Sequence, residues 1–271
     1  MTRMRIFLAE PFASLWRGKD PFAEVARLSG EVFRDLDGRS TFRIEQAGKG
    51  FFVKRHSGIG WREILKNWSK GKAPVLGARQ EFAAIERLHA LSVPTMTAVA
   101  FGERGRNPAR QESFLITEEL APTVDLEVFT QRWPETPPPL ALKRALIKTL
   151  AGLIGKMHAG GVNHRDCYLC HFLLRTDPLP TPEALGLSVI DLHRAQCRTV
   201  TPRRWRDKDL AALNFSAQAI GLTRRDVYRF LHAYFQQPLR RILAEEAASL
   251  SAIARKTERL IDRKRRYGDA L

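Results

Sequence analysis

Residues 163–174 read Asn163-His164-Arg165-Asp166-Cys167-Tyr168-Leu169-Cys170-His171-Phe172-Leu173-Leu174, and they support two incompatible interpretations. Read from Cys167, the stretch is C-x-x-C-H, the attachment pattern of a c-type haem. Read from His164, it is an H-R-D triplet that leads into a short apolar strand, so that Asp166 would stand on a loop. The rest of the chain decides between the two interpretations, and this choice also determines the predicted fold.

The composition is that of a globular protein with an unusual charge. The chain has 271 residues, of which 44% are hydrophobic and 27% are charged. This suits one large domain or two lobes with a buried core, and disorder is not expected. The 45 Lys and Arg residues against 29 Asp and Glu residues give a net charge of +16. Such a charge attracts nucleic acid, phosphorylated glycans, anionic membranes or acidic proteins. No nucleic-acid recognition motif occurs, so nucleic acid is not the expected partner.

Several features favour a cytoplasmic location. Three cysteines are too few for a disulfide framework, and the first residues lack a signal-peptide pattern. No apolar run approaches the roughly 18 residues that cross a bilayer. The haem interpretation is weakened, because c-type attachment normally happens across the membrane and no second axial ligand is evident. Zinc bound by Cys167, Cys170 and His171 would need a fourth ligand, for which Cys197 is conceivable.

Hydrophobic periodicity predicts an α+β chain in two lobes. Alternation predicts strands over 31–36, 41–46 and 51–55, joined by tight turns that include Gly48 and Gly50. A helix is expected over 78–91, followed by strands over 97–103 and 113–117. A long amphipathic helix over 140–160 then opens a mostly helical part. We expect a small lobe over 1–120, a larger lobe over 121–271 and a hinge between Glu119 and Pro139.

The groups that phosphoryl transfer requires occur in the expected order. Lys54, on the third strand after the glycine turn, would hold nucleotide phosphates, and Glu81, 27 residues later, would orient Lys54. Asp166 would accept the proton of the acceptor hydroxyl, while His164 would brace the loop. Asp191, 25 residues after Asp166 and at the end of an apolar strand, would bind Mg²⁺.

The order and context of these residues resemble protein kinases. The resemblance predicts a two-lobed protein-kinase-like fold with a small antiparallel β lobe, one helix in that lobe and a larger helical lobe. ATP would bind the small lobe near Gly48 and Gly50. A helix beginning near Lys208 would let Asp209 tie down the loop of Asp166. Cys167 and Cys170 would then be small buried residues of a short strand beside that loop.

One position departs from the kinase pattern. Kinases keep an Asn that binds Mg²⁺ five residues after the catalytic Asp, and here that residue is His171. Imidazole is a poor ligand for Mg²⁺. Either one Mg²⁺ site is lost, or His171 has another role, such as a hydrogen bond to the loop or a contact with a nucleotide phosphate.

The region after Asp191 bears on the acceptor. Asp209 follows within 18 residues, with no A-P-E motif and no long activation loop, which favours a non-protein acceptor. The segments VNHRDCYLCHFLL, IDLHRAQ, RWRDKDLAAL, LWRGKDPF and FFVKR resemble the bacterial lipopolysaccharide core heptose kinases. That resemblance implies ATP-dependent phosphorylation of the first heptose of the inner core, at the cytoplasmic face of the inner membrane. It carries the four roles over to Asp166, Lys54, Glu81 and Asp191.

Two basic regions suit an acidic, membrane-embedded substrate. One is Trp61–Lys72, where Arg62, Lys66, Lys70 and Lys72 alternate with Trp61 and Trp68. The other is a C-terminal helix with an apolar stripe of Leu250, Ile253, Leu260 and Ile261 and with basic residues on its other side. Either region is equally consistent with an ordinary surface segment.

Two other functions remain open, together with one further partner. An acidic protein such as an acyl carrier protein would also suit the charge of +16. The alternatives to a sugar kinase are a protein (tyrosine) kinase and a kinase-like module that binds lipopolysaccharide core with weak catalysis or none.

Overall fold

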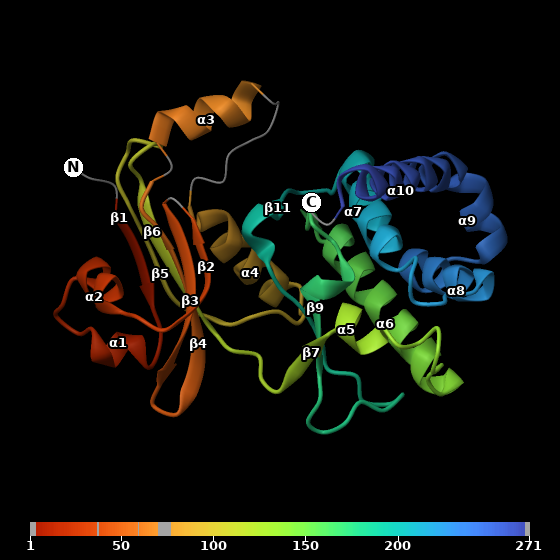
Figure 1. Cartoon of the computed structure of the whole chain (residues 1–271), viewed down its shortest axis with the longest axis horizontal. Coiled ribbons are helices and arrows are strands. Elements are labelled where there is room, and N and C mark those ends of the chain that lie inside the picture. The colour runs from red at the N-terminus through yellow and green to blue at the C-terminus, as the bar shows by residue number, and fades with distance from the viewer. Residues whose placement is uncertain (1–3, 37, 59, 70–76, 269–271) are drawn as a thin grey trace. The chain divides into compact units, whose positions relative to one another are not determined.

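The computed structural model describes residues 4–36, 38–58, 60–69 and 77–268. The chain divides into two compact units (Figure 1). The first comprises Met1–Glu86 and Met96–Glu119, and the second comprises Arg87–Thr95 and Leu120–Leu271. The predicted division at 120–121 placed residues 87–95 in the first lobe, whereas they cluster with the second unit. Within the described residues, no helix combines the length and apolarity needed to span a bilayer.

The first unit is built on an antiparallel sheet, which has six strands among the described residues, in the order β1-β5-β6-β4-β3-β2. The predicted meander over 31–55 is confirmed as β2, β3 and β4, and the two later strands are β5 and β6. The bounds are Met4–Leu8 for β1, Glu31–Leu36 for β2, Arg39–Gln46 for β3, Lys49–His56 for β4, Ala98–Arg104 for β5 and Glu112–Glu118 for β6.

The prediction of five strands and one helix for this unit was incomplete. Edge strand β1 pairs with β5, and helices α1 (Phe12–Leu15), α2 (Pro21–Arg27) and α3 (Gly60–Ser69) accompany the predicted helix α4 (Arg79–Ala90). The start signal of α2 is present in the sequence, because the side chain of Asp20 accepts a hydrogen bond from the Phe22 amide and Pro21 occupies the first turn. Strand β1 has five residues and helix α1 has four, so neither is long enough to show a hydrophobic period in the sequence.

Apolar residues cover both faces of this sheet. On one face, α1 and α2 insert Phe12, Trp16 and Phe22 into a buried cluster with Phe51 and Phe114 of the sheet. On the other face, α4 stacks Phe82 on Phe101 of β5 with ring centroids 4.4 Å apart. Neighbouring residues of a strand point to opposite faces, so the sheet packs against helices on both sides. This packing holds β4 and α4 against each other.

The second unit is mainly helical. Its helices are α5 (Leu126–Thr130), α6 (Leu140–Ala159), α7 (Arg203–Ser216), α8 (Arg224–Phe235), α9 (Leu239–Glu245) and α10 (Ala247–Tyr267). Two small antiparallel sheets accompany them, of order β10-β9-β7 and β11-β8. Their bounds are Thr123–Asp125 for β7, Val162–Asn163 for β8, Phe172–Arg175 for β9, Leu187–Val189 for β10 and Gln196–Cys197 for β11. The α+β class, with a small β-rich part and a larger helical part, is confirmed.

Helix α6 is the core of the second unit. Leu146, Leu150, Ile154 and Met157 are buried along it at helical spacing, as its amphipathic pattern predicts. It ends at Gly160, and the chain turns through Gly161 into β8 and the loop of Asp166. Gly161 has φ +83°, and a Cβ there would collide with the carbonyl of Arg198, so the turn requires glycine.

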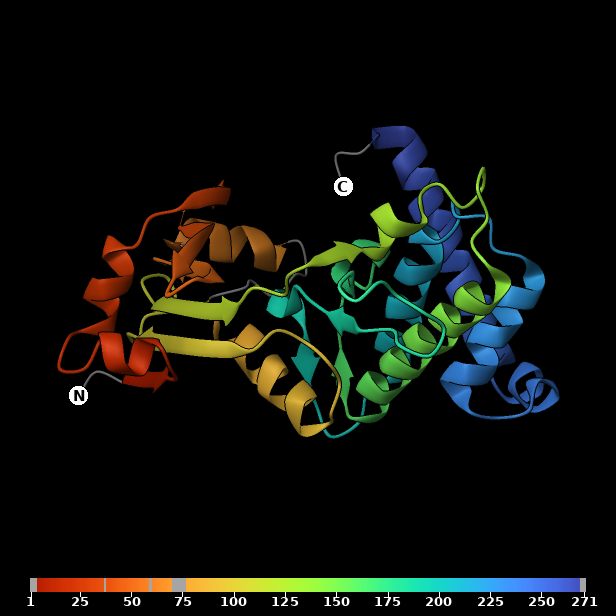
Figure 2. The same ribbon diagram turned by 90° about the horizontal axis from the view of Figure 1, so that it is seen from below.

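One prediction about the later helices was wrong. Helix α7 begins at Arg203, after Pro202, and not near Lys208, so Asp209 lies in its second turn. Helix α10 lies against α7 (Figures 1 and 2), but its buried residues are Ser249 and Thr257, and the predicted apolar stripe is only half-buried. The hydroxyl of Ser249 donates to Asp207 at 2.6 Å, and that of Thr257 donates to the Ala211 carbonyl at 3.3 Å. Polar contacts therefore fix this packing.

The first basic region is only partly described. Trp61 and Leu65 on α3 are exposed, at 49% and 57% of their surface, and Arg62 and Lys66 are exposed beside them. The predicted contributions of Lys70 and Lys72 lie outside the described residues.

Candidate active site

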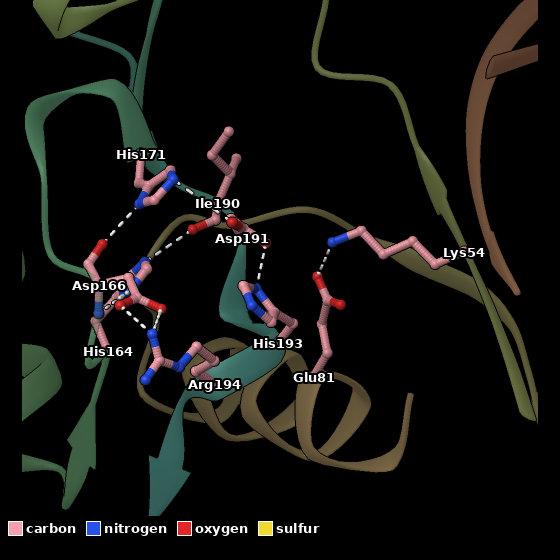
Figure 3. A network of polar contacts seen from close by, with 9 residues as sticks. All are labelled: Lys54, Glu81, His164, Asp166, His171, Ile190, Asp191, His193 and Arg194. Atoms are coloured by element: carbon pink, nitrogen blue, oxygen red, sulfur yellow. Dashed lines mark hydrogen bonds and ion pairs between the residues drawn. The ribbon is translucent and has the colours of Figure 1, made fainter. Parts of the chain in front are cut away.

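In the first unit, Lys54 and Glu81 form an ion pair. Lys54 Nζ lies 2.6 Å from Glu81 Oε1 (Figure 3). Strand β4 supplies Lys54, and the first turn of α4 supplies Glu81, whose side chain is 1% exposed. A buried carboxylate is costly unless it is paired, so this ion pair holds the lysine in one orientation. The two residues that the sequence paired are therefore brought together.

The turn before Lys54 contains two glycines, and each position requires glycine for a different reason. Ala47 and Gly48 form a two-residue hairpin turn with φ of +51° and +72°, the left-handed values that such turns require. Gly50 lies under the carboxylate of Glu119, and a Cβ at this position would collide with it. Arg43 donates two hydrogen bonds to that carboxylate, at 2.9 and 2.8 Å. The contact with a nucleotide predicted for both glycines stays a prediction.

In the second unit, Asp209 organises the loop of Asp166. One oxygen of the buried Asp209 carboxylate accepts the backbone N–H of His164 at 2.6 Å, and the other accepts that of Arg165 at 2.8 Å. His158 Nε2 lies 3.2 Å from the same carboxylate, and the Tyr234 hydroxyl lies 2.7 Å from His158 Nδ1. Burial raises the pKa of Tyr234, so its hydroxyl keeps the proton. The prediction that Asp209 ties down this loop is confirmed.

His164 braces the loop from within. Its Nε2 lies 2.9 Å from the carbonyl oxygen of Ile190, and its Nδ1 lies 3.3 Å from the amide nitrogen of Asp166. These contacts require Nε2 to donate and Nδ1 to accept, which is the arrangement of a neutral imidazole. Burial lowers the pKa of this fully buried ring, consistent with the neutral form. His164 thus connects the loop of Asp166 to the segment that carries Asp191.

Asp166 pairs with an arginine. Arg194 Nη1 donates to Asp166 Oδ1 at 2.8 Å and to Oδ2 at 3.0 Å (Figure 3). The Asp166 side chain remains 16% exposed. The preceding residue, Arg165, has φ +75°, which turns the chain sharply before the carboxylate. Arg194 therefore orients the Asp166 carboxylate, and part of that carboxylate remains open to solvent.

Asp191 lies between two imidazoles. His193 Nδ1 donates to Asp191 Oδ1 at 2.7 Å, and His171 Nε2 lies 3.5 Å from Asp191 Oδ2 (Figure 3). Asp191 has left-handed backbone angles, φ 57° and ψ 54°, at the start of a 3₁₀ helix over Leu192–Arg194. Its side chain is 31% exposed. A half-exposed carboxylate shortly after β10 (Leu187–Val189) is suited to binding a hard cation.

His171 has a structural partner on the loop. Its Nδ1 donates to the carbonyl oxygen of Asp166 at 2.6 Å, and its ring stacks on that of His164 with an interplanar angle of 7°. Of the two roles that the sequence left open, the hydrogen bond to the loop is present. A contact with a nucleotide phosphate stays a prediction.

The cysteines beside the loop have raised pKa values. Cys167 is fully buried, and burial raises the pKa of its thiol. Burial, followed by the nearby charge of Glu127, raises the pKa of Cys170 to about 12. Both lie before β9, around a 3₁₀ helix over Leu169–His171, and not in the strand itself. Among the described residues, no group of three or more His, Cys, Asp or Glu side chains is placed to hold a metal ion.

Sequence reasoning missed the residues that contact the two aspartates. His193 and Arg194 stand two and three residues after Asp191, where Leu-His takes the place of the Phe-Gly of kinases. That departure was the available signal, because two polar residues replace a glycine and its neighbour. Their targets depend on the 3₁₀ turn, which directs His193 to Asp191 and Arg194 to Asp166.

Comparisons with known proteins cover almost the whole chain. Residues 23–234 match the profile of the lipopolysaccharide kinase (Kdo/WaaP) family. The chain is 62% identical to "Lipopolysaccharide core heptose(I) kinase WaaP" of Pseudomonas aeruginosa, over 99% of this chain and 100% of that protein. A protein of the same name from Escherichia coli K12 is 51% identical over 96% of this chain and 98% of its own length.

One solved structure extends the comparison to the fold. "WaaP in complex with acyl carrier protein" superposes with a TM-score of 0.85 at 58% sequence identity, covering 94% of this chain and 99% of that one. The similarity therefore includes both units.

Proposed function

Because the chain belongs to the lipopolysaccharide kinase (Kdo/WaaP) family, we propose that it transfers the γ-phosphoryl group of ATP to the first heptose of the lipopolysaccharide inner core. It is a phosphotransferase that acts on a sugar hydroxyl, as the resemblance of its motifs predicted. The observation that carries the residue roles is the loop of Asp166, whose backbone is bound by Asp209 and whose carboxylate is oriented by Arg194.

Asp166 acts as the proton acceptor in this proposal. The acceptor hydroxyl donates its proton to the carboxylate as its oxygen attacks the γ-phosphorus, and the bond to the β–γ bridging oxygen breaks. Arg194 keeps the carboxylate oriented until the acceptor arrives. His164 and His171 hydrogen-bond the backbone amide and the backbone carbonyl of Asp166. The position of the carboxylate is therefore fixed by the backbone as well as by its side-chain rotamer.

Asp191 is the residue proposed to hold Mg²⁺. No all-protein metal cage exists among the described residues, but Mg²⁺ at nucleotide sites is usually bound through one or two carboxylates together with phosphate oxygens. The half-exposed carboxylate of Asp191 fits that arrangement. When bound, Mg²⁺ neutralises phosphate charge during transfer. His193 donates to the Oδ1 of Asp191 and leaves the other oxygen to face His171.

Lys54 is proposed to hold the nucleotide phosphates, with Glu81 as its orienting partner. The ion pair is short, and the carboxylate is buried, so the ammonium group is fixed before the nucleotide binds. Gly48 and Gly50 shape the hairpin that leads to this lysine.

The acidic partner is proposed to be an acyl carrier protein. A related structure contains one, and the chain carries a net charge of +16. Oppositely charged surfaces accelerate association and orient the partners. The same charge suits peripheral contact with the anionic cytoplasmic face of the inner membrane, where the core acceptor is anchored. The exposed basic residues of α10, which are Arg255, Arg259, Arg263, Lys264, Arg265 and Arg266, would supply part of that contact.

A transfer assay tests the function. Purified protein receives γ-labelled ATP and Mg²⁺ together with unphosphorylated lipopolysaccharide core and, in parallel, a mixed protein extract, with Asp166→Ala as the blank. We expect label on the heptose of the core that disappears in the blank. Label on protein alone would favour a protein kinase. ATP binding without transfer to either acceptor would indicate a binding module.

A further inference from the structure

Four cations surround one indole ring on α7. The charged groups of Arg204, Arg165, Lys208 and Arg198 lie 5.1, 5.3, 5.7 and 5.9 Å from the ring centroid of Trp205. We call these five residues the Trp205 cluster. A cation near an indole is ordinarily stabilised by one favourable contact, whereas four cations around the same ring also repel one another.

The cations of the Trp205 cluster are not directly paired with carboxylates, although the charges of Asp166 and Asp209 lie near Arg165 and Lys208. Arg198 donates to neutral groups, Asn163 Oδ1 at 2.6 Å and Gln196 Oε1 at 2.7 Å. In the part of the chain that the structure describes, none of the four cations forms an ion pair with a carboxylate. Burial, then the nearby Arg194, lowers the pKa of Arg165; burial, then Arg165, lowers the pKa of Lys208. In both groups burial is the largest cause, and the carboxylates of Asp166 and Asp209 act in the opposite direction.

Two buried donors of the Trp205 cluster also lack acceptors. Arg165 Nε and Trp205 Nε1 are both buried, and neither has a hydrogen-bond partner among the described residues. Buried N–H groups without an acceptor are uncommon in folded proteins and are expensive. Surplus positive charge and unpaired donors in one place are what a binding site for an anion provides.

The Trp205 cluster lies beside the proton acceptor. Arg165 is the residue before Asp166, and Arg194, which binds the Asp166 carboxylate, adds to the repulsion on both Arg165 and Lys208. The backbone of Arg165 is also held by Asp209, from the same helix as Trp205. An anion bound here would therefore be a near neighbour of the hydroxyl that Asp166 deprotonates.

We propose that the Trp205 cluster is an acceptor subsite that binds an anionic group, carboxylate or phosphate, of the saccharide next to the hydroxyl that receives phosphate. This inference rests on the proposed function, because it takes the saccharide as acceptor. Arg204 and Lys208 supply charge, and Arg165 couples the bound anion to the loop of Asp166. The subsite would select heptose that is attached to acidic sugars over neutral heptose-containing glycans.

The test uses lipid-free inner-core saccharide as acceptor, so that membrane binding does not contribute. Three forms are compared: the native saccharide, a form whose carboxylates are reduced to alcohols, and a form from which existing phosphates are removed. The variant is Arg204→Gln/Lys208→Gln, because these side chains are exposed or half-exposed and lie outside the proton-transfer residues. Lys208→Arg keeps the charge. The control is Arg132→Gln/Arg240→Gln, which removes two exposed charges elsewhere in the same unit.

We expect the KM for native saccharide to rise about tenfold or more in Arg204→Gln/Lys208→Gln, the size of a lost charge-assisted hydrogen bond, with the KM for ATP unchanged. Lys208→Arg and the control should retain the native KM. The effect should vanish with whichever neutralised form lacks the recognised group, and this identifies carboxylate or phosphate. An unchanged KM, or an equal rise with every saccharide form, would overturn the subsite and leave the cluster a structural contact of α7.

Calorimetric binding of the saccharide without ATP separates this inference from the proposed function. Binding to the wild type that is lost in Arg204→Gln/Lys208→Gln supports the subsite even if no phosphate is transferred, in which case the kinase function alone fails. Equal binding to wild type and variant, or no binding to either, rejects the subsite. Thermal unfolding of each variant verifies that the comparison is made between folded proteins.

Discussion

His171 stands where kinases place an amide that binds Mg²⁺, and its contacts explain what an imidazole does there. Its Nδ1–H is used by the Asp166 carbonyl, and its other nitrogen faces Asp191. The ring therefore hydrogen-bonds the backbone of one aspartate and lies close to the side chain of the other. We propose that His171 supports the loop of Asp166 in place of binding Mg²⁺.

The ion pair of Lys54 and Glu81 predicts coupled losses of activity. Lys54→Ala removes the phosphate ligand, and Glu81→Ala releases the lysine from its position. Each should lower kcat/KM by about 100-fold, since misplacing a binding group costs that much. Because both act through the same ammonium group, the double variant should be little worse than either single one.

Kinetic constants for the four proteins of this cycle check the coupling. Additive losses would mean that Glu81 acts independently of Lys54.

His164 makes stability depend on pH. Burial lowers the pKa of this ring from its ordinary 6.5, so the unfolded chain binds the proton more readily than the folded protein. The contribution of His164 to the free energy of unfolding is fully present above about pH 6.5. It is lost as the pH falls from there through the lower pKa that His164 has in the folded protein. Each pH unit within that interval costs at most about 1.4 kcal/mol.

Unfolding free energies of the wild type and His164→Gln, measured from pH 7.5 to 5, test this dependence. The slope of the unfolding free energy against pH should be smaller in the variant, by an amount equivalent to the uptake of at most one proton. Identical slopes would show that His164 remains as easily protonated after folding.

At the scale of elements, α7 acts as the support of the loop that carries Asp166. Asp209, in its second turn, accepts hydrogen bonds from the two amides of the loop. Trp205, in its first turn, packs against the guanidinium group of Arg165. Helix α6 and α8 add His158 and Tyr234 to the chain of hydrogen bonds. Secondary-structure elements distant in sequence therefore hold one short loop.

Removing the Asp209 carboxylate should destabilise the fold as well as the activity. Asp209→Ala leaves the amides of His164 and Arg165 buried without acceptors, which should lower the free energy of unfolding by about 2–4 kcal/mol. Turnover should fall with it, because the loop loses its support. Denaturant unfolding measures the loss, with the exposed Asp262→Ala on α10 as the matched control. A stable but inactive Asp209→Ala would assign it a chemical role instead.

Helix α10 is predicted to serve membrane-bound acceptor. Ser249 and Thr257, its buried residues, form hydrogen bonds with α7, while Arg255 and Arg259 are exposed. Arg255→Gln/Arg259→Gln should weaken turnover of acceptor in anionic vesicles and should spare lipid-free saccharide. The loss should shrink as salt rises, since exposed charges are screened over about 8–10 Å at physiological ionic strength. A loss that is independent of salt would indicate a structural role, and Arg132→Gln/Arg240→Gln is the matched control.

At the scale of the whole molecule, the net charge of +16 is a property that no single site requires. It is spread over both units and exceeds what binding one nucleotide needs. We predict that binding to an acyl carrier protein is electrostatically driven, so that its Kd weakens strongly between about 50 mM and about 300 mM salt. Calorimetric titrations at the two ionic strengths measure the change. A Kd that does not respond to salt would indicate an apolar interface.

The order of motifs determined the class of the fold and the principal acidic and basic residues. Lys54, Glu81, Asp166, Asp191 and Asp209 were singled out because they occur in the order that kinases have, within or shortly after predicted strands and helices. The meander, α4 and α6 were predicted to within a few residues from their hydrophobic periodicity. Short elements such as β1 and α1 have too few residues to show a period.

Only the tertiary structure decided which side chains meet. The pairing of Arg194 with Asp166, of His193 with Asp191 and of His171 with the loop depends on two short 3₁₀ turns and on left-handed residues at 165 and 191. The four cations around Trp205 come from α7 and from the residues that follow β8 and β11. Hydrophobic periodicity is a local property and can be read from the chain. Side-chain contacts between segments tens of residues apart depend on packing, which no local pattern contains.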